Sequence, residues 1–278
     1  MEKKPHPDIE PAEELLKRIQ KERNIKKNFS LKASEEELKE IPDTWKWIAI
    51  GNYAECNRGR FSVRPRNDPN YYNGEYPFIQ IGDLPREGGL ISSHTQTLNE
   101  KGLGVSKMFS KGTVAIAIVG ATIGNTGILD YDMCFPDSLV GIQTGNNISN
   151  IYVDYYLRSE KEKIRLISYA GGGQPNIKLQ TLNPYPFPLP PLEEQKEIVR
   201  RVEALFRKCD LIEQRYLKAK TYTDKLTQSI LAKAFRGELV PQDPNDEPAE
   251  VLLERIREEK TLTEKSSKGK KRSKSKTT

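Results

Sequence analysis

The sequence contains few of the residues that bind metals or form disulfides. Its three cysteines, Cys56, Cys134 and Cys209, lie far apart and form no CxxC pair, and its only histidines are His6 and His94. Structural zinc sites use four Cys or His ligands at short spacings, so a dedicated metal site is excluded. Widely separated thiols are typical of a reducing cytosol. We therefore expect no metal site and a cytoplasmic location.

Long hydrophobic runs are also missing. The longest purely aliphatic stretch spans residues 114–119, far short of the roughly 20 residues that cross a bilayer. The opening MEKKPHPDIEPAEE has no apolar segment typical of secretory signals. No membrane partner is therefore expected. The 12 Tyr, 8 Phe and 2 Trp argue against disorder throughout, and 278 residues have room for one sizeable core or two small domains.

The positive charge is concentrated at one end of the chain. The formal net charge is +6, but the last 14 residues, from Lys265, hold seven basic residues and no acidic one. Without those seven charges, residues 1–264 have a net charge of −1. Global charge therefore does not indicate nucleic-acid binding, and local patches must carry that argument. The tail itself is expected to add affinity for phosphates without sequence specificity.

Composition divides the chain into five regions. They are a helical N-terminal segment (1–40), a domain rich in Gly, Pro, aromatic and β-branched residues (41–191), a stretch without Pro or Gly (192–236), a linker with a second helix (237–262) and a disordered basic tail (263–278). This order predicts an α+β fold, in which a mixed, β-rich domain precedes one long helix.

An internal repeat links the two ends of the chain. Residues 10–23 read EPAEELLKRIQKER and residues 247–260 read EPAEVLLERIREEK. Both place Pro in the first helical turn, where its missing N–H is tolerated. The same apolar face recurs: Leu15, Leu16 and Ile19 in the first, Leu252, Leu253 and Ile256 in the second. Helices rich in Glu, Lys and Leu can look alike by chance, but the shared EPAE favours one repeat of a two-repeat protein.

Local patterns within the central domain predict several elements. Residues 78–81 and 113–119 are β-branched runs that predict strands, the second buried on both faces. Residues 150–167 have the apolar period of one helix. The run PYPFPLPP at 184–191 is incompatible with a helix or a central strand and predicts a stiff, extended exit from the domain.

The long helix has an unbroken apolar seam. Its positions alternate in steps of four and three: Ile198, Val202, Leu205, Cys209, Ile212, Tyr216, Ala219, Thr223, Leu226 and Ile230. This is the period of a coiled coil. About 44 residues make a rod of roughly 65 Å, and the chain has no second helix of that length to cover it. We expect a second copy as the partner; the alternative is a helix packed along its own domain.

Motifs that would support catalysis are incomplete. The segment Asp68-Pro69-Asn70-Tyr71 lacks the second Pro of the amino-methyltransferase motif. GATIGNTG lacks the Gly-Lys-Ser/Thr ending of a P-loop, and Pro136-Asp137 is not followed by the Asp/Glu-x-Lys of a nuclease. The two histidines form no convincing base–nucleophile pair. We therefore expect no catalytic residues and no cofactor.

Binding residues are better supported. The segment NRGRFSVRPRNDPNYYNG concentrates arginines between aromatic residues and turn formers, so we expect a loop whose guanidinium groups contact phosphates or guanine edges. The candidate DNA-binding residues are Arg58, Arg60, Arg64, Arg66, Lys107, Lys111, Gln174, Asn176 and Lys178. A solvated loop with scattered ion pairs is the alternative for the arginines, and a plain loop is the alternative for the amides.

Five segments together resemble a known family. They are IPDTWKWIAIGNYAE, YPFIQIGDL, GTVAIAIVGATIGNTGIL, GGGQPNIKLQTLNPYPFPLPPLEEQKEIV and AFRGELVPQ. In this order they resemble the specificity subunit of type I restriction–modification systems, most specifically where PLPPLEEQ (188–195) leads into the long helix. Typical members have two target-recognition domains, each followed by a long helix, and the two helices form an antiparallel coiled coil. This chain has one of each and resembles a half-subunit.

The resemblance implies a role in DNA recognition. Residues 41–191 would read one half of a bipartite site in double-stranded DNA, and the helix would be both spacer and dimer seam. Modification subunits would dock on the helix pair and bring the methyltransferase chemistry, with a restriction subunit as a further partner. The alternatives are a stand-alone DNA methyltransferase or nuclease, a coiled-coil scaffold without sequence reading, and a truncated remnant of a two-domain subunit.

Overall fold

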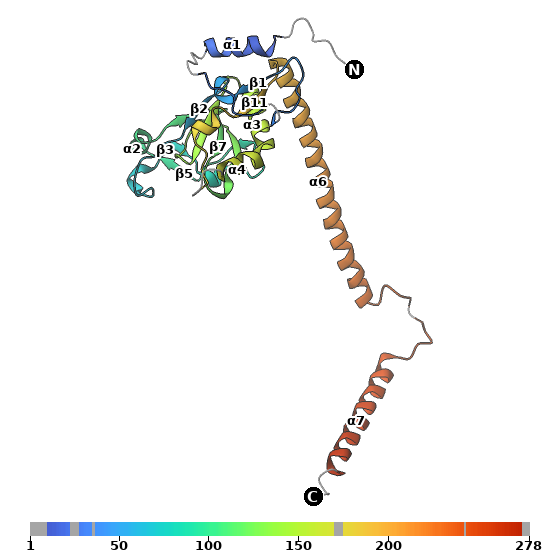
Figure 1. The fold of residues 1–278 in the computed structure, drawn as a ribbon. Coiled ribbons are helices and arrows are strands. Elements are labelled where there is room, and N and C mark those ends of the chain that lie inside the picture. Colours follow the sequence, from blue (N-terminus) through green and yellow to red (C-terminus); the bar gives the residue numbers. More distant parts are fainter. Residues whose placement is uncertain (1–9, 23–27, 35–36, 170–174, 242, 274–278) are drawn as a thin grey trace. The chain divides into compact units, whose positions relative to one another are not determined.

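The computed structural model describes residues 10–22, 28–34, 37–169, 175–241 and 243–273 (Figure 1). The chain separates into two compact units, residues 1–206 and 207–278. Within the described residues, the first unit contains all the strands and the short helices α1 (Ala12–Glu22), α2 (Glu100–Gly104), α3 (Asn147–Ser159), α4 (Lys161–Tyr169) and α5 (Leu179–Leu182). The long helix α6 (Leu192–Phe235) follows, and then α7 (Ala249–Ser273). The predicted α+β class is confirmed.

Eleven strands form three sheets in the described part of the first unit. The central sheet has the order β2 (Glu55–Arg58), β10 (Leu139–Gln143), β7 (Val114–Ala117), β8 (Thr126–Leu129) and β4 (Leu90–Ile91). A second sheet has the order β5 (Gln96–Leu98), β3 (Tyr72–Phe78), β9 (Met133–Cys134) and β6 (Met108–Phe109). The third is the antiparallel pair of β1 (Lys46–Ala49) and β11 (Pro186–Leu189).

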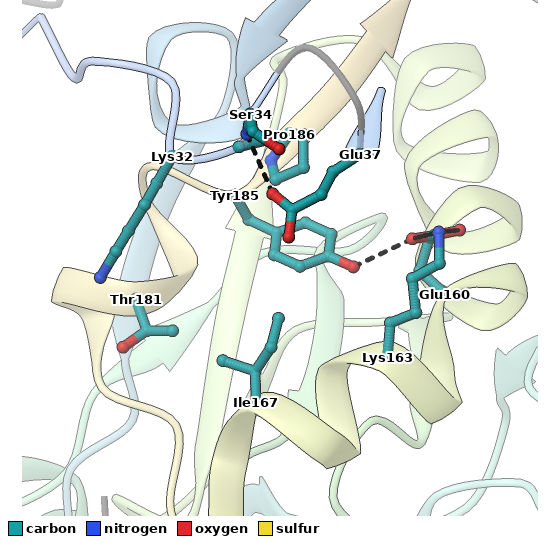
Figure 2. A pocket seen from close by; sticks show the side chains of 10 residues that line it. Lys32, Ser34, Glu37, Glu160, Lys163, Ile167, Thr181, Tyr185 and Pro186 are labelled. Carbon is teal, nitrogen blue, oxygen red and sulfur yellow. Dashed lines mark hydrogen bonds and ion pairs between the residues drawn. The ribbon is translucent and has the colours of Figure 1, made fainter. Parts of the chain in front are cut away.

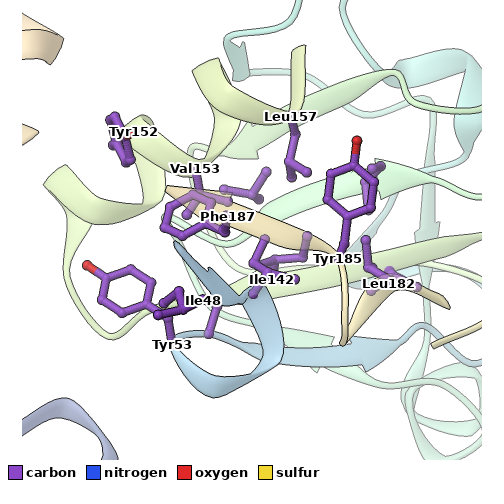
Figure 3. Close-up of a cluster of buried hydrophobic side chains, with 14 of the residues drawn as sticks. Ile48, Tyr53, Ile142, Tyr152, Val153, Leu157, Leu182, Tyr185 and Phe187 are labelled. Carbon is purple, nitrogen blue, oxygen red and sulfur yellow. The ribbon is translucent and has the colours of Figure 1, made fainter. Parts of the chain in front are cut away.

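Strand β7 lies at the centre of the core, as its lack of alternation predicts. Its four residues are buried, and successive side chains of a strand point to opposite faces. Val114 and Ile116 therefore pack in the cluster that contains Phe187, whereas Ala115 and Ala117 pack in a separate one. Figure 3 shows part of the first cluster, in which Tyr53, Tyr185 and Phe187 lie among aliphatic side chains.

The proline-rich exit is part of the core. Strand β11 pairs with β1 alone. Proline has no backbone N–H, so it is tolerated in a strand that is hydrogen-bonded on one side only. Phe187 is fully buried and stacks on Tyr53 at 5.7 Å between ring centroids. The Tyr152 hydroxyl donates to the Pro188 carbonyl at 3.0 Å, and the Tyr156 hydroxyl donates to the Pro186 carbonyl at 2.7 Å. The exit is therefore held on both sides.

Two local predictions differ from the structure. The single helix expected over residues 150–167 is divided at Glu160 into α3 and α4. The Ser159 hydroxyl donates to the Tyr156 carbonyl at 2.7 Å, a local bond that competes with the helical ladder. The strand expected at 78–81 ends at Phe78, and residues 81–83 form a 3₁₀ turn. The Asp83 carboxylate accepts from the Gln80 backbone N–H at 2.7 Å and stabilises this turn.

The first turns of α6 belong to the β-rich domain. Gln195 and Val199 are buried, and the Gln195 side chain donates to the Pro190 carbonyl at 3.0 Å. The Trp45 indole N–H donates to the Glu194 carboxylate at 2.6 Å. Ile198, the first residue of the predicted seam, packs against the domain core. The seam is therefore partly covered by its own chain at this end, because these turns complete the core.

The repeated segments form similar helix starts. In α1, the Arg18 guanidinium donates to both oxygens of Glu10 at 2.9 and 2.8 Å. In α7, Arg255 pairs with Glu247 at 2.8 Å. The apolar faces differ in environment: Ala12, Leu15 and Ile19 are buried in the core, whereas Leu252 and Ile256 are 42% and 38% exposed.

Helix α7 is longer than the sequence predicts. It continues to Ser273, through most of the segment 263–278 for which we expect disorder. Lys and Arg are good helix formers, so a basic composition does not by itself end a helix. The remaining residues, 274–278, lie outside the described part of the chain.

Candidate nucleic-acid interface

Asp137 connects three of the four arginines in the predicted patch. Strand β2 ends at Arg58, which pairs with Val140 of β10, so the patch begins beside the turn that precedes β10. The Arg58 Nε donates to the Asp137 backbone carbonyl at 2.6 Å. Arg66 forms an ion pair with the Asp137 carboxylate at 2.5 Å, and Arg64 approaches it at 3.9 Å. These four residues, the Asp137 cluster, have a net charge of +2, from three guanidinium groups and one carboxylate.

Arg60 is fixed on the neighbouring segment. Its guanidinium donates twice to the Ser106 carbonyl, at 3.1 and 2.7 Å, and the Ser106 hydroxyl donates back to the Arg60 carbonyl at 2.9 Å. The adjacent Lys107 ammonium lies 5.2 Å from the centroid of the Phe109 ring. Each patch arginine thus has a protein partner, although the Arg64 and Arg66 side chains remain 58% and 46% exposed. The patch is an ordered cationic surface.

The other predicted residues are distributed around the sheet. Asn176 forms an isolated β-bridge with Val119, just after the end of β7. The neighbouring Ile118 N–H donates to the carbonyl of Ser138, the residue after Asp137, at 3.1 Å. Asn176 therefore lies at the same end of β7 as the Asp137 cluster. Lys178 is exposed at the start of α5. Gln174 lies outside the described residues.

Lys111 lies apart from the arginines. Lys111 lies just before the first residue of β7. Leu139, two residues after Asp137, pairs with Ala117, the last residue of β7. Lys111 and Asp137 therefore lie near opposite ends of this strand. The Lys111 ammonium lies 3.3 Å from the Asp130 carboxylate, and its backbone N–H donates to Asp132 at 2.8 Å. The structure therefore does not bring Lys111 together with the predicted patch.

A polar cleft of about 600 Å³ adjoins the Asp137 cluster through Arg66 and Pro136. We call it the β3–β5 cleft, because its walls come from these strands and from the loop that carries Arg66. Its aromatic lining is ordered by contacts of the Phe61 ring, whose centroid lies 5.6 Å from Tyr72 and 5.1 Å from Phe78. Its polar lining includes Arg66, Asn67, Gln80, His94, Thr95 and Gln96.

Sequence reasoning missed most of this cleft. Gln80 and Gln96 lie 16 residues apart and are brought together by the pairing of β3 with β5, in which Phe78 is opposite Gln96. Only a prediction of strand register would have found this pair, because neither glutamine belongs to a motif. His94 lies close to Tyr131, with 2.5 Å between its Nδ1 and the phenol oxygen. That contact also links distant segments.

A larger cavity, of about 770 Å³, lies beside α4 (Figure 2). Its acidic groups already have partners: Glu160 accepts from Lys163 at 2.8 Å and from the Tyr185 hydroxyl at 3.1 Å. Burial and the nearby Glu160 charge raise the pKa of Tyr185, so its phenol stays protonated. The cavity's lysines, Lys32 and Lys163, are balanced by Glu37 and Glu160. This balance favours the Asp137 cluster and the β3–β5 cleft as the surface for a polyanion.

Other classes of site are missing from the described residues. Within them, no cluster of His, Cys, Asp and Glu side chains has the geometry of a metal site. None of the helices in that part of the chain combines the length and apolar character needed to span a bilayer.

The first unit is a β-rich domain with a cationic surface, and the long helix that follows it has exposed apolar side chains. Residues 42–221 match the family model described as the type I restriction modification DNA specificity domain. The match covers more than half of the chain, so the chain belongs to this family.

Relatives from two organisms support this assignment. The type I restriction enzyme EcoDI specificity subunit of Escherichia coli is 31% identical over 259 residues, covering 87% of this chain and 54% of that protein. The EcoBI specificity subunit of Escherichia coli is 35% identical over 249 residues, covering 80% and 49%. The putative MjaX specificity subunit of Methanocaldococcus jannaschii is 31% identical over 208 residues, covering 73% and 45%. The chain spans about half the length of these relatives.

Solved structures show the same fold. The HsdS subunit from Thermoanaerobacter tengcongensis aligns with a TM-score of 0.55 at 20% identity, covering 82% of this chain and 57% of that one. A chain from a structure of the type I R-M system that addresses complex assembly and conformational transition aligns with a TM-score of 0.58 at 20% identity, covering 82% and 58%.

Proposed function

We propose that this chain is a DNA-recognition subunit of a type I restriction–modification system and reads one half of a bipartite target in double-stranded DNA. The observation that carries the proposal is the match of residues 42–221 to the DNA specificity domain. The chain acts in the cytoplasm and is not itself an enzyme; modification subunits supply the methyl transfer.

The Asp137 cluster supplies the contacts to the DNA backbone. Exposed guanidinium groups held at fixed positions bind phosphates and set the register of a domain on the duplex. Arg60 and Lys107 extend this cationic surface, and Asn176 and Lys178 add polar contacts from the segment beside the end of β7. This assignment rests on the exposure of the arginines, Asn176 and Lys178, with Lys107 half-buried beside them, and on the cleft next to Arg66.

A second copy of the chain pairs along the seam of α6, and the two helices form an antiparallel coiled coil. Supporting this, Ile212, Tyr216, Leu226 and Ile230 are between 45% and 65% exposed in the single chain. Apolar side chains repeated at coiled-coil spacing are buried by a partner helix. A two-fold symmetric dimer would read the same half-site on each strand.

The dimer has a direct test. Light scattering of the wild type at micromolar concentration should give the mass of two copies for the chain alone, and the mass of an assembly with two copies when modification subunits are present. Ile212→Asp, which places a charge in the seam, should shift the mass toward one copy, whereas Glu213→Asp, outside the seam, should leave it unchanged. A monomeric wild type under both conditions would contradict the proposed pairing.

The modification subunits dock on the remaining apolar surface of α6. Leu217, Leu231 and Phe235 lie outside the seam, within about 40° of one another around the helix axis at 100° per residue. They are 53%, 53% and 88% exposed. An apolar line left uncovered by the seam is suited to a further protein partner. A restriction subunit then joins this assembly.

Methylome sequencing of the host with and without the gene tests the function. We expect one bipartite methylation motif, palindromic in its two halves, to disappear on deletion. An unchanged methylome would contradict the proposal and favour a truncated remnant. A motif written by this chain in cells without modification subunits would instead favour the alternative of a stand-alone methyltransferase.

A further inference from the structure

Two glutamines in the β3–β5 cleft form a paired amide. The Gln80 Nε2 donates to the Gln96 Oε1 at 2.7 Å, and both side chains are exposed. An amide oxygen has two lone pairs and an amide nitrogen has two donor hydrogens. The bond therefore fixes the orientation of the Gln96 amide and leaves its NH₂ group and one lone pair of its oxygen to bind a ligand.

The backbone on both sides of the pair is held by one carboxylate. Asp83 accepts from the Gln80 N–H at 2.7 Å and from the Thr95 hydroxyl at 3.2 Å. Thr95 directly precedes Gln96, which is paired with Phe78 in the sheet. The two glutamines thus project from backbone already fixed before DNA arrives, which lowers the conformational entropy lost on binding.

We propose that Gln96, oriented by Gln80, reads an adenine in the half-site by a bidentate contact to its major-groove edge. Adenine presents the N7 acceptor and the N6 donor side by side, the pattern that a glutamine amide complements. The inference rests on the proposed function, since it requires duplex DNA on this surface. Arg66 lines the same cleft and also belongs to the Asp137 cluster, which we assign to the DNA phosphates.

A base edge fits the cleft better than a phosphate does. The amides are neutral, and the Asp83 carboxylate beside them repels an anion. Cationic groups that attract phosphates lie in the Asp137 cluster, whereas the Gln80–Gln96 pair offers a donor and an acceptor together. The Asp137 cluster, which borders the cleft through Arg66, then positions the DNA backbone, and the amide pair reads the base.

The test uses the full chain assembled with its modification subunits and duplexes that carry the motif found by methylome sequencing. Each base pair of one half-site is replaced in turn, and binding is measured at fixed salt. Gln96→Ala should reduce the preference for adenine at one position by roughly 5- to 150-fold, the equivalent of one bidentate base contact. Preferences at the other positions should be unchanged.

Two further variants keep the test decisive. Gln96→Glu retains the acceptor for Gln80 but has no donor for N7, so its preference should move toward cytosine, whose N4 donates to a carboxylate. Gln214→Ala, an exposed glutamine of α6, should match the wild type.

Three outcomes are distinguishable. Equal weakening of every duplex by Gln96→Ala would show a phosphate contact and overturn the inference. A motif read by the wild type and left unaltered by both Gln96 variants would also overturn it. A wild-type assembly that protects no defined sequence would contradict the proposed function itself.

Discussion

At the scale of single residues, Asp137 determines how the arginine patch is presented. It accepts from Arg58 through its carbonyl and pairs with Arg64 and Arg66 through its carboxylate. A mobile arginine loses side-chain entropy when it binds, whereas one already held loses less. The Asp137 carboxylate therefore lowers the net positive charge of the cluster, but it also holds the guanidinium groups in fixed positions.

Arg66→Ala should weaken binding to all duplexes alike, because we assign Arg66 a phosphate contact. Loss of one such contact reduces the slope of log affinity against log salt by about 1. Fluorescence anisotropy over a range of salt concentrations measures that slope. Arg165→Ala, on α4 and paired with Glu162, is the control and should leave the slope unchanged. A relaxed preference at a single base position would instead indicate that Arg66 contacts a base.

Asp154 makes the stability of the domain depend on pH. It is fully buried, and its nearest cation, Arg158, lies 3.8 Å away. Burial raises the pKa of this carboxyl above its ordinary value, with the nearby Thr126 hydroxyl and the charge of Arg158 opposing the shift. The folded state therefore binds the proton more tightly than the unfolded state, so stability falls as pH rises from the ordinary pKa through the raised one.

Asp154→Asn should accordingly increase the free energy of unfolding at pH 7. The gain should shrink as pH falls through the raised pKa and vanish below the ordinary one, where the wild-type carboxyl is protonated in both states. Urea unfolding at a series of pH values measures it. A less stable variant at pH 7 would mean that the ion pair with Arg158 outweighs the burial of the charge.

The sequence predicts which kind of side chain forms the patch, and that assignment stays a prediction, but it does not indicate the partners of these side chains. The density of arginines marked the patch, but the carboxylate that orders it is 71 residues from Arg66. Gln80 and Gln96 have no sequence signal, because only strand register places them together. Long-range partners follow from topology, which local composition does not determine.

At the scale of elements, the repeated helix offers a matched comparison. Leu15 of α1 is fully buried, whereas the equivalent Leu252 of α7 is 42% exposed. Leu15→Ala should lower the free energy of unfolding by about 2–5 kcal/mol, as for other buried leucines. Leu252→Ala should change it by less than about 0.5 kcal/mol.

Tryptophan fluorescence during urea unfolding suits this comparison. The two tryptophans of the chain, Trp45 and Trp47, both lie in the recognition domain, so the signal reports on the unit that α1 stabilises. Equal losses in the two variants would mean that Leu252 stabilises the recognition domain as much as Leu15 does, against the exposure of its side chain.

Elements were predicted well where one rule dominates. The absence of Pro and Gly predicts a long helix over residues 192–236, and α6 spans Leu192–Phe235. The uniformly apolar run predicted the buried strand β7. The division between α3 and α4 was missed, because a break of one residue at Glu160 leaves the helical period nearly unchanged. The proline run was expected as an exit, and its pairing with β1 needed a distant partner strand.

At the scale of the whole molecule, α6 should set the distance between the two half-sites. Val202 and Phe206 line a cavity with Tyr155 and Arg158, so they belong to the recognition domain. A heptad removed farther along, residues 210–216, keeps the seam in phase and shortens the rod by about 10 Å.

The shortened dimer should retain its half-sites and prefer a gap smaller by roughly three base pairs, at about 3.4 Å each. The DNA must twist to restore the facing of the two halves. Methylation of a library of gap lengths by the assembled subunits measures the preference, with the intact chain as reference. A shortened dimer that keeps the original gap would show that the coil does not determine spacing.

The common start of α1 and α7 also has a genetic consequence. If two copies of the gene lay in tandem, one crossover between the segments for residues 247–260 and 10–23 would join them in frame. No new linker sequence would be needed, because the two segments are equivalent. Leu252 and the Arg255–Glu247 pair would then occupy the positions of Leu15 and the Arg18–Glu10 pair beside the second domain. The product would carry two recognition domains free to diverge, and so could acquire an asymmetric target that two identical copies do not read.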